Sequence, residues 1–292
     1  MQVLTHRRTI ARLTALAVLL ALGWWLRTLE PLHLTAAVVW PWTSTTITVY
    51  YADGPFLFPV SRRLPSAADL PRASIEALLA GPPVQTGLSS TLPAGLTFQG
   101  LDVKDRVAHV RLAGPAQAVR DAPLAVPAVV ATLTRVPGIT GVALTVDGLP
   151  MTDAAARAPL LYYPSARGLV AIPTAASDPR AALDAFLGGP PSPDLTGLPP
   201  DARLLGAELD ADHVFALRFA YTPSLRVLAL ERPDRMRFLL LGLIATLTGY
   251  PEVRAVHLDF GGQSRLGLGE CSDLLRTPQS RPALLNYERL LR

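Results

Sequence analysis

Histidine is the side chain that most often acts as a general base or a metal ligand, and it occurs five times in this sequence. No two of these histidines have the HExxH spacing or another metal-ligating spacing. Three of them, His109, His213 and His257, fall in segments with the alternating pattern of a β-strand. A solvent-facing or hydrogen-bonded imidazole is the ordinary role there, so the histidines predict no metal site.

The motifs of nucleophilic and nucleotide-dependent enzymes are also missing. No GxSxG nucleophile, GxxxxGK phosphate loop or GxGxxG following a strand occurs. Neighbouring acids, such as Asp102 with Asp105 and Asp210 with Asp212, stand at predicted hairpins, where acids favour turns. A sequence does not show whether two carboxylates face one cleft, as glycoside hydrolysis requires. We therefore predict no catalytic residues, no enzymatic activity and no cofactor.

The single cysteine, Cys271, lies near the C-terminus. One thiol forms no internal disulfide, and its neighbours have no CxxC spacing. The alternatives are a reactive nucleophile and a small buried side chain, and the absence of activating neighbours favours the buried side chain.

Two pairs of adjacent tyrosines are the best candidates for a role beyond packing: Tyr50 with Tyr51, and Tyr162 with Tyr163. Adjacent strand residues point to opposite faces, so one tyrosine of each pair is expected in the core and one at the surface. The simple interpretation is one core and one surface aromatic in each pair. The functional alternative is that the outward tyrosines form a contact surface between domains or subunits. These four residues are our candidate interaction surface.

The elements that carry these tyrosines occur twice. Ala131–Gly148 (ATLTRVPGITGVALTVDG) returns as Ala245–Gly262 (ATLTGYPEVRAVHLDFGG). Each copy ends an apolar helix, breaks at a proline and continues as an alternating strand, because proline stops the helix before it. Other matching segments keep the same order, at offsets between 106 and 114 residues. Ordered matches at a nearly constant offset predict two tandem domains.

The hydrophobic patterns and turn signals of each copy predict the element order ββαββαβ. We therefore predict an α+β fold of two small tandem domains, each with helices packed on a mainly antiparallel sheet, and pseudo-twofold packing of the halves. The predicted first domain spans residues 46–150, and a linker of residues 151–159 follows. The second, divergent domain spans 160–262. A C-terminal tail, residues 263–292, is expected to dock its leucines on a neighbouring surface.

The N-terminal residues 1–30 predict a cytoplasmic tip and a transmembrane signal anchor. Arg7, Arg8 and Arg12 precede the uncharged run Leu13–Leu26, which ends in two tryptophans suited to a membrane interface. Membrane contact is expected through residues 10–29, with a linker at 31–45. Positive charge before the run predicts a cytoplasmic N-terminus and an extracytoplasmic body. Cleavage as a signal peptide, giving a secreted protein, is the alternative.

The net charge of the chain is +4 and the isoelectric point is near 9.6. Arginine supplies nearly all of the positive charge, since the only lysine is Lys104. No basic cluster interleaved with aromatic residues occurs, so we predict no nucleic-acid partner.

Several of these segments resemble the GerMN domain, which is named for a sporulation and spore-germination protein that itself contains two copies. The resemblance rests on the Tyr-Tyr strand, a helix ending in Leu-Leu-x-Gly-Pro, the turn of Pro137 to Val142 and the closing Val-Asp-Gly. It covers Thr46–Pro150 well and Pro159–Gly262 less well, because Glu252 stands where the first copy has Gly138. The resemblance implies a small α/β domain of exported, membrane-anchored envelope proteins, similar to ring-building modules, and it implies no catalysis.

Two functions from different classes follow. The preferred one is a non-enzymatic assembly or scaffold module in the bacterial cell envelope, with a protein partner or self-association. The alternative is an envelope binding module for a cell-wall or small-molecule ligand. A flat apolar patch or an open sheet edge favours assembly, and a concave polar cleft favours ligand binding. The sequence does not identify the partner, the oligomeric state or whether the organism sporulates.

Overall fold

The structure is a computed structural model, and it describes residues 44–65, 69–261, 271–283 and 285–286. The predicted membrane anchor, residues 1–30, lies outside these ranges, as does most of the predicted linker. Within the described ranges, no helix has both the length and the apolar character needed to cross a membrane. The described residues from Ser44 onward belong to one compact unit.

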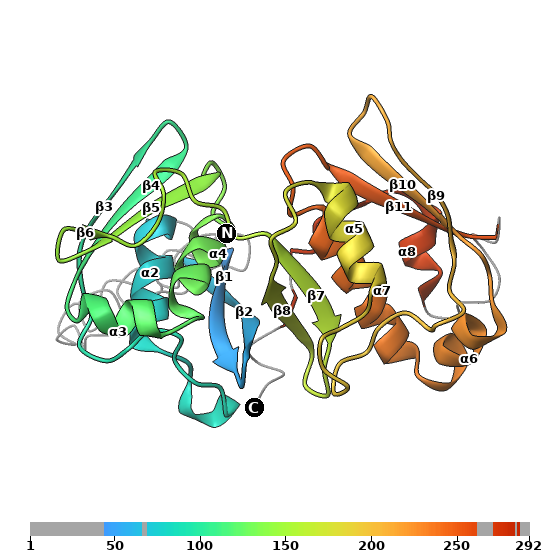
Figure 1. The fold of residues 1–292 in the computed structure, drawn as a ribbon, viewed down its shortest axis with the longest axis horizontal. Coiled ribbons are helices and arrows are strands. Elements are labelled where there is room, and N and C mark those ends of the chain that lie inside the picture. The colour runs from blue at the N-terminus through green and yellow to red at the C-terminus, as the bar shows by residue number, and fades with distance from the viewer. Residues whose placement is uncertain (1–43, 66–68, 262–270, 284, 287–292) are drawn as a thin grey trace, which may run out of the picture. The chain divides into compact units, whose positions relative to one another are not determined.

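The first copy begins with a long hairpin and ends with a strand, as its sequence predicts (Figure 1). Its elements are, in order, β1 (Ser44–Asp53), β2 (Phe56–Pro65), α2 (Leu70–Ala80), the 3₁₀ turn η2 (Val84–Thr86), β3 (Thr97–Lys104), β4 (Val107–Ala113), α3 (Ala116–Asp121), α4 (Ala125–Leu133), β5 (Gly141–Val146) and β6 (Leu149–Pro150).

The second copy repeats the helices and strands of the first from β1 to β5, without a 3₁₀ turn in the described segment between its first helix and third strand, and then adds elements from the C-terminal tail. Its elements are β7 (Leu160–Pro164), β8 (Leu169–Pro173), α5 (Pro179–Leu187), β9 (Leu204–Leu209), β10 (Val214–Phe219), α6 (Pro223–Glu231), α7 (Pro233–Leu247), β11 (Ala255–Phe260), α8 (Asp273–Arg276) and β12 (Gln279–Ser280). The predicted α+β fold of two tandem domains is confirmed.

Within the described residues the strands form three four-stranded sheets, and most strand pairs are antiparallel. Strands β3-β4-β5-β6 belong to the first copy, and β12-β11-β10-β9 to the second. The middle strands pair in parallel, β4 with β5 and β10 with β11. The first hairpin of each copy leaves its own sheet and joins a shared one, in the order β1-β2-β8-β7. From either edge, the first strand of one copy is followed by its second strand and then by the second and first strands of the other copy. Pseudo-twofold packing requires this symmetric order.

Strand alternation places the core as the sequence predicts. In β4, Ala108, Val110 and Leu112 are buried and Arg111 is exposed. The equivalent strand β10 buries Phe215, Leu217 and Phe219 and exposes Arg218 at the matching position. One face of each outer sheet therefore packs on helices, because successive side chains of a strand point to opposite faces.

Helices α3 and α6 were not predicted from the sequence. Helix α6 carries a start signal, since the side chain of Thr222 accepts a hydrogen bond from the Leu225 N–H and Pro223 occupies the first turn. A side-chain N-cap also starts α5, where the Asp178 carboxylate accepts a hydrogen bond from the Ala181 N–H at 2.8 Å. The signal before α6 was readable from the sequence, whereas α3 has no side-chain cap.

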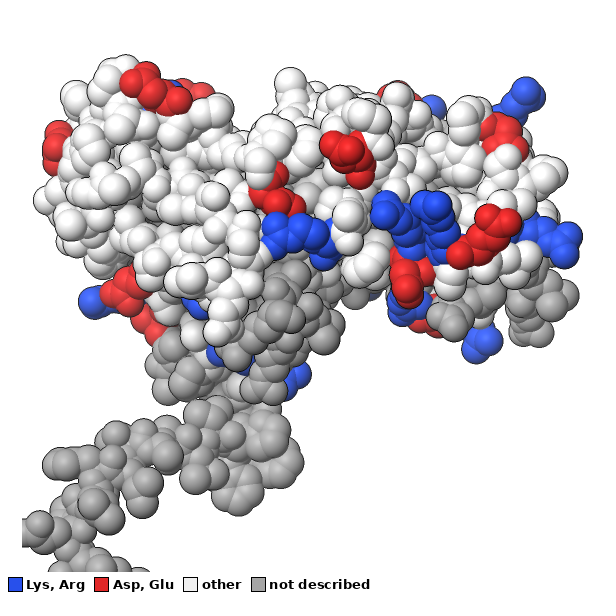
Figure 2. Space-filling model, turned by 90° about the horizontal axis from the view of Figure 1, so that it is seen from below, with Lys and Arg blue, Asp and Glu red and all other residues white. Residues whose placement is uncertain are grey.

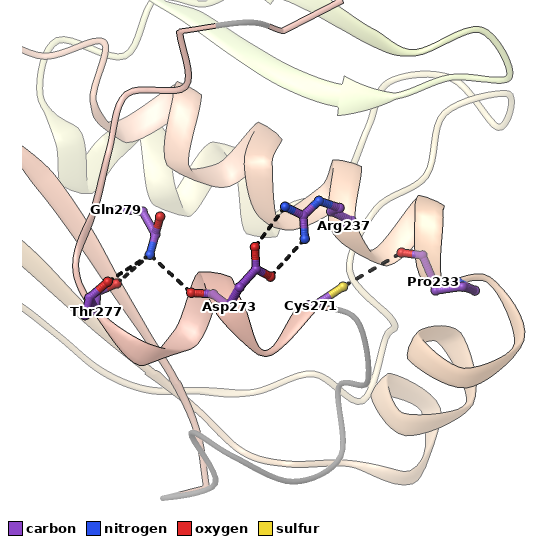
Figure 3. A network of polar contacts seen from close by, with 6 residues as sticks. All are labelled: Pro233, Arg237, Cys271, Asp273, Thr277 and Gln279. Atoms are coloured by element: carbon purple, nitrogen blue, oxygen red, sulfur yellow. Dashed lines mark hydrogen bonds and ion pairs between the residues drawn. The ribbon is translucent and has the colours of Figure 1, made fainter.

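The C-terminal segment docks on the second copy through a polar network (Figure 3). The guanidinium of Arg237 in α7 donates two hydrogen bonds of 2.9 Å to the carboxylate of Asp273 in α8. Cys271 is buried, and its sulfur lies 3.8 Å from the Pro233 carbonyl oxygen. The docked leucines within the described residues are Leu274, Leu275 and Leu285, all buried.

Asn286 joins the two copies. Its amide nitrogen donates to the carbonyl oxygens of Pro59 in β2 and Leu169 in β8, at 2.9 and 2.7 Å, and its amide oxygen accepts from the Leu169 N–H at 2.9 Å. Pro59 has no N–H to give to a ladder. The buried amide of Asn286 therefore replaces direct strand pairing here, and the close approach of its oxygen leaves room only for a glycine at position 168.

Candidate functional site

All four tyrosines of the candidate interaction surface are buried, with no side-chain area exposed: Tyr50, Tyr51, Tyr162 and Tyr163. The expectation that one tyrosine of each pair faces solvent is therefore wrong. The reason is that helices pack on one face of the shared sheet, and Tyr50 and Tyr162 contact each other on the other face. A strand buried on both faces has no outward position for an aromatic side chain.

Tyr51 and Tyr163 stabilise the helix that follows the hairpin in their own copy. The Tyr51 hydroxyl donates to the Ala77 carbonyl oxygen of α2 at 3.0 Å. The Tyr163 hydroxyl lies 3.1 Å from the Phe186 carbonyl oxygen of α5, and its ring stacks on Phe186 with the centroids 4.7 Å apart. Burial raises the pKa of Tyr163 above its ordinary value. The last carbonyls of a helix lack partners within the helix, so these hydroxyls have a structural role.

Tyr50 and Tyr162 meet each other between the copies. They come from the outer strands β1 and β7, and their hydroxyl oxygens lie 2.6 Å apart. Both rings point inward across the shared sheet, where the residues opposite them, Pro59 and Ala171, leave room. A contact between equivalent residues of two copies lies on the pseudo-twofold axis. Both residues belong to the predicted interaction surface, but nothing in the sequence predicted that they touch.

Arg135 lies over this pair, just beyond the end of α4. Its Nε donates to the Tyr50 hydroxyl at 2.8 Å, and its Nη2 donates to the Tyr162 hydroxyl. Its guanidinium carbon is 5.9 Å from the Tyr50 ring centroid and 5.6 Å from that of Tyr162. One cation therefore binds a tyrosine of each copy through hydrogen bonds and cation–π contacts.

Burial governs the ionisation of this cluster. It raises the pKa of Tyr162 well above its ordinary value, and the Arg135 charge only partly opposes this. Burial also acts to lower the pKa of Arg135, but Tyr162 and Tyr50 together outweigh it, so the net shift of that pKa is upward. At neutral pH Tyr162 is therefore a neutral phenol and Arg135 a guanidinium cation, and this arrangement suits positioning and not acid–base catalysis.

The repeated Ala-Thr-Leu-Thr segment positions the same strands in both copies. The hydroxyl of Thr132 in α4 accepts from the Tyr50 N–H at 3.2 Å, and that of Thr246 in α7 accepts from the Tyr162 N–H at 3.0 Å. The N–H groups at the edges of the shared sheet thereby gain partners from helix side chains. A helix over an edge strand also prevents further strand pairing. This explains why the segment occurs twice.

The two copies differ directly after this segment, where Gly249 in the second copy aligns with Arg135 in the first. Gly249 lines a small cavity of about 60 Å³ together with Arg135, Tyr162 and Arg281. The missing side chain at position 249 therefore leaves space beside the tyrosine pair. The break in the repeat was visible in the sequence as a difference between copies, but its meaning was not.

The small cavity shares five lining residues with an open cleft of about 600 Å³ between the two copies: Thr134, Ala158, Pro159, Gly249 and Arg281. Arg106, Arg157 and Arg281 are the cations of the cleft, and Glu252 is its one carboxylate. Burial, with Asp178 and Glu252, raises the pKa of Tyr250 in this cleft to about 12. The lining is therefore polar and positively charged.

No group of three or more histidine, cysteine or acidic side chains that could hold a metal ion occurs among the residues that the structure describes. On the face seen in Figure 2, basic and acidic side chains lie next to one another. Charge of both signs on one face gives no extended positive field there.

The arrangement is that of a tandem α+β repeat protein whose copies share a sheet and meet at a tyrosine pair. A profile of the Germane family, described as "Sporulation and spore germination", matches residues 48–152 and again residues 160–265. The two matches cover most of the chain, so this protein belongs to the Germane family, whose repeat is the GerMN domain.

A solved structure supports the fold. The chain is similar to the tandem GerMN domains of the sporulation protein GerM from Bacillus subtilis, with 20% identity and a TM-score of 0.60, over 83% of this chain and 99% of that one. The first GerMN domain of the same protein matches 39% of this chain and 92% of that one, at 21% identity and a TM-score of 0.27. No curated protein sequence matches.

Proposed function

We propose that this protein is a non-enzymatic assembly module, held by its N-terminal segment outside the membrane of a bacterial cell envelope. Its partner is another protein or a second copy of itself. The family description concerns sporulation and spore germination and names no catalytic activity. The buried Tyr50, Tyr162 and Arg135 join the copies to each other, which keeps the two domains in fixed positions, as a scaffold needs.

The observation that carries this proposal is a pair of equivalent edge strands. Strand β3 is an edge of the first outer sheet and β9 is an edge of the second, within the described residues. Val103 on β3 is 46% exposed, and Leu209 at the matching position of β9 is 43% exposed. Leu205, also on β9, is 64% exposed. An edge strand with exposed apolar side chains can pair with another chain.

The experiment is light scattering on residues 44–292, which form one compact unit, across a concentration series. Reversible self-association supports the assembly role. The double variant Leu205→Lys with Leu209→Lys should abolish association through β9, because a charged edge strand resists pairing. Val84→Lys is the matched control, since Val84 is 99% exposed and lies in the 3₁₀ turn η2, outside any edge strand. A strict monomer at high concentration would rule out self-assembly and leave a different protein as the partner.

The second candidate is the binding module. The cleft between the copies favours it, because a cavity of about 600 Å³ has the size of a small-molecule site. This role is compatible with assembly, since β3 and β9 do not line the cleft.

A further inference from the structure

We propose that the cleft between the two copies binds a small molecule that carries two or more oxyanion groups, carboxylate or phosphate. The proposal gives a chemical class to the ligand of the binding module, and it rests on that second candidate function. It does not depend on the assembly role, which the light-scattering experiment tests separately.

The cations of the cleft come from three separate parts of the chain. Arg106 lies in the turn between β3 and β4, Arg157 in the segment between the copies, and Arg281 directly after β12. None of the three has an ion-pair partner within the described residues. Like charges around one cavity repel each other, and an anionic ligand would neutralise this repulsion. The unpaired arginines therefore favour an anionic ligand.

Arg281 provides a hydrogen-bond donor without a partner among the described residues. Its Nη1 donates to the Thr248 carbonyl oxygen at 2.7 Å, which fixes the guanidinium against the end of α7. Its Nε is buried and has no hydrogen-bond partner among the described residues. An unsatisfied buried donor costs free energy, more so on a charged group. An oxyanion that reached this Nε from the cleft would remove this cost.

The hydroxyl groups of the cleft already have partners. Thr134 and Thr248 donate to carbonyl oxygens of their own helices, at 2.8 and 2.6 Å. The Tyr250 hydroxyl donates to the Ala176 carbonyl oxygen at 3.0 Å, and the Ser177 hydroxyl donates to a carboxylate oxygen of Asp178 at 3.2 Å. The donors left for a ligand are mainly guanidinium groups. These select oxyanions over neutral sugars, since a guanidinium matches the two oxygens of a carboxylate or phosphate.

The size of the cleft indicates more than one anionic group. A cavity of about 600 Å³ lies in the range of small-molecule sites, and a single phosphate would leave most of it empty. Because the three arginines lie on separate segments, we expect them to contact separate anionic groups of the ligand. Glu252 is the one lining carboxylate, and it opposes a uniformly anionic ligand on its side of the cleft.

The test is calorimetric titration of the full chain with tripolyphosphate and with citrate, which separate phosphate from carboxylate recognition, and with maltotriose as a neutral probe. At low salt we expect one of the two anions to bind with a dissociation constant below about 1 mM, and maltotriose not to bind. Arg281→Gln should weaken binding at least about tenfold. Arg157→Gln, at an exposed linker position, provides a second variant with little risk to folding.

Arg120→Gln on α3 is the matched control, because it removes the same charge from an exposed position outside the cleft. Its affinity should equal that of the wild type. Two results would overturn the proposal. One is no binding of either anion up to about 10 mM. The other is an Arg120→Gln variant that loses as much affinity as Arg281→Gln and Arg157→Gln, which would show attraction by net charge alone.

Discussion

The two copies of the repeat use equivalent threonines for the same task, yet they differ three residues later. Thr132 and Thr246 each accept the N–H of a tyrosine in an edge strand of the shared sheet. Three residues further on, the first copy has Arg135 and the second has Gly249. Only the first copy therefore supplies a cation to the tyrosine pair.

This difference follows from the pseudo-twofold axis between the copies. Residues that each copy needs for its own domain can occur twice, since the two sites are far apart. A residue that reaches the axis meets its own counterpart there. Two guanidinium groups over one tyrosine pair would occupy the same space with the same charge. The axis therefore accommodates one arginine, and the equivalent glycine leaves the cavity that joins the cleft.

The largest expected effect tests a second difference between the copies. Gly242 in α7 aligns with Ala128 in α4, and a Cβ at position 242 would overlap the Tyr162 carbonyl oxygen. Gly242→Ala should lower the free energy of unfolding by about 3 kcal/mol, because the helix must move away from β7. The reciprocal Ala128→Gly should cost less, about 2 kcal/mol, through helix propensity and the loss of one buried methyl group. Urea denaturation measures both, and equal effects would contradict the asymmetry.

An intermediate effect is expected at the cation on the axis. Arg135→Gln removes charge-assisted hydrogen bonds to two buried hydroxyls, which then retain only their hydrogen bond to each other. The free energy of unfolding should therefore fall by about 2 kcal/mol. Arg120→Gln should leave stability unchanged. The swapped variant Arg135→Gly with Gly249→Arg should not restore stability, since a Cβ at position 249 would lie 2.9 Å from the Thr246 carbonyl oxygen. Full restoration would show that either copy can supply the cation.

The smallest effect is expected at the phenols. Tyr162→Phe should cost about 1 kcal/mol at neutral pH, for one lost hydroxyl. Burial raises the pKa of Tyr162 in the folded protein above the value of 10.0 that an unburied tyrosine has. Its contribution to stability is therefore present below pH 10 and is lost as the pH rises above it, because the unfolded chain then releases a proton that the folded one keeps. Unfolding measured between neutral and alkaline pH should show a shallower decline for Tyr162→Phe than for the wild type.

Much of the fold was predictable from the sequence because its signals are local. Alternation in the segment around Val110 identified a strand, and Pro137 and Pro251 marked the ends of helices. The family resemblance then agreed with the order of elements. The short helix α3 was missed, since no capping side chain marks its start.

The candidate site was only half predictable. The tyrosine pairs were identified as unusual, but their exposure was predicted from strand alternation alone, and that rule assumes one solvated face. Whether a face is solvated depends on what packs there, in this case Arg135 and a tyrosine 112 residues away in the chain. The cleft arginines carried no motif, because they come from a turn, a linker and the C-terminal segment.

The sequence by itself determined that the protein is a tandem repeat with the element order ββαββαβ, apart from short elements that it missed, such as α3 and α6. It could do so because periodicity, proline breaks and the duplicated Ala-Thr-Leu-Thr segment are properties of neighbouring residues. The tertiary structure alone decided that the first hairpins of the two copies share one sheet. It also decided that Tyr50 meets Tyr162 beneath Arg135, and that three further arginines line one cleft. These contacts join residues far apart in the chain, and their partners are fixed only when the two copies pack together.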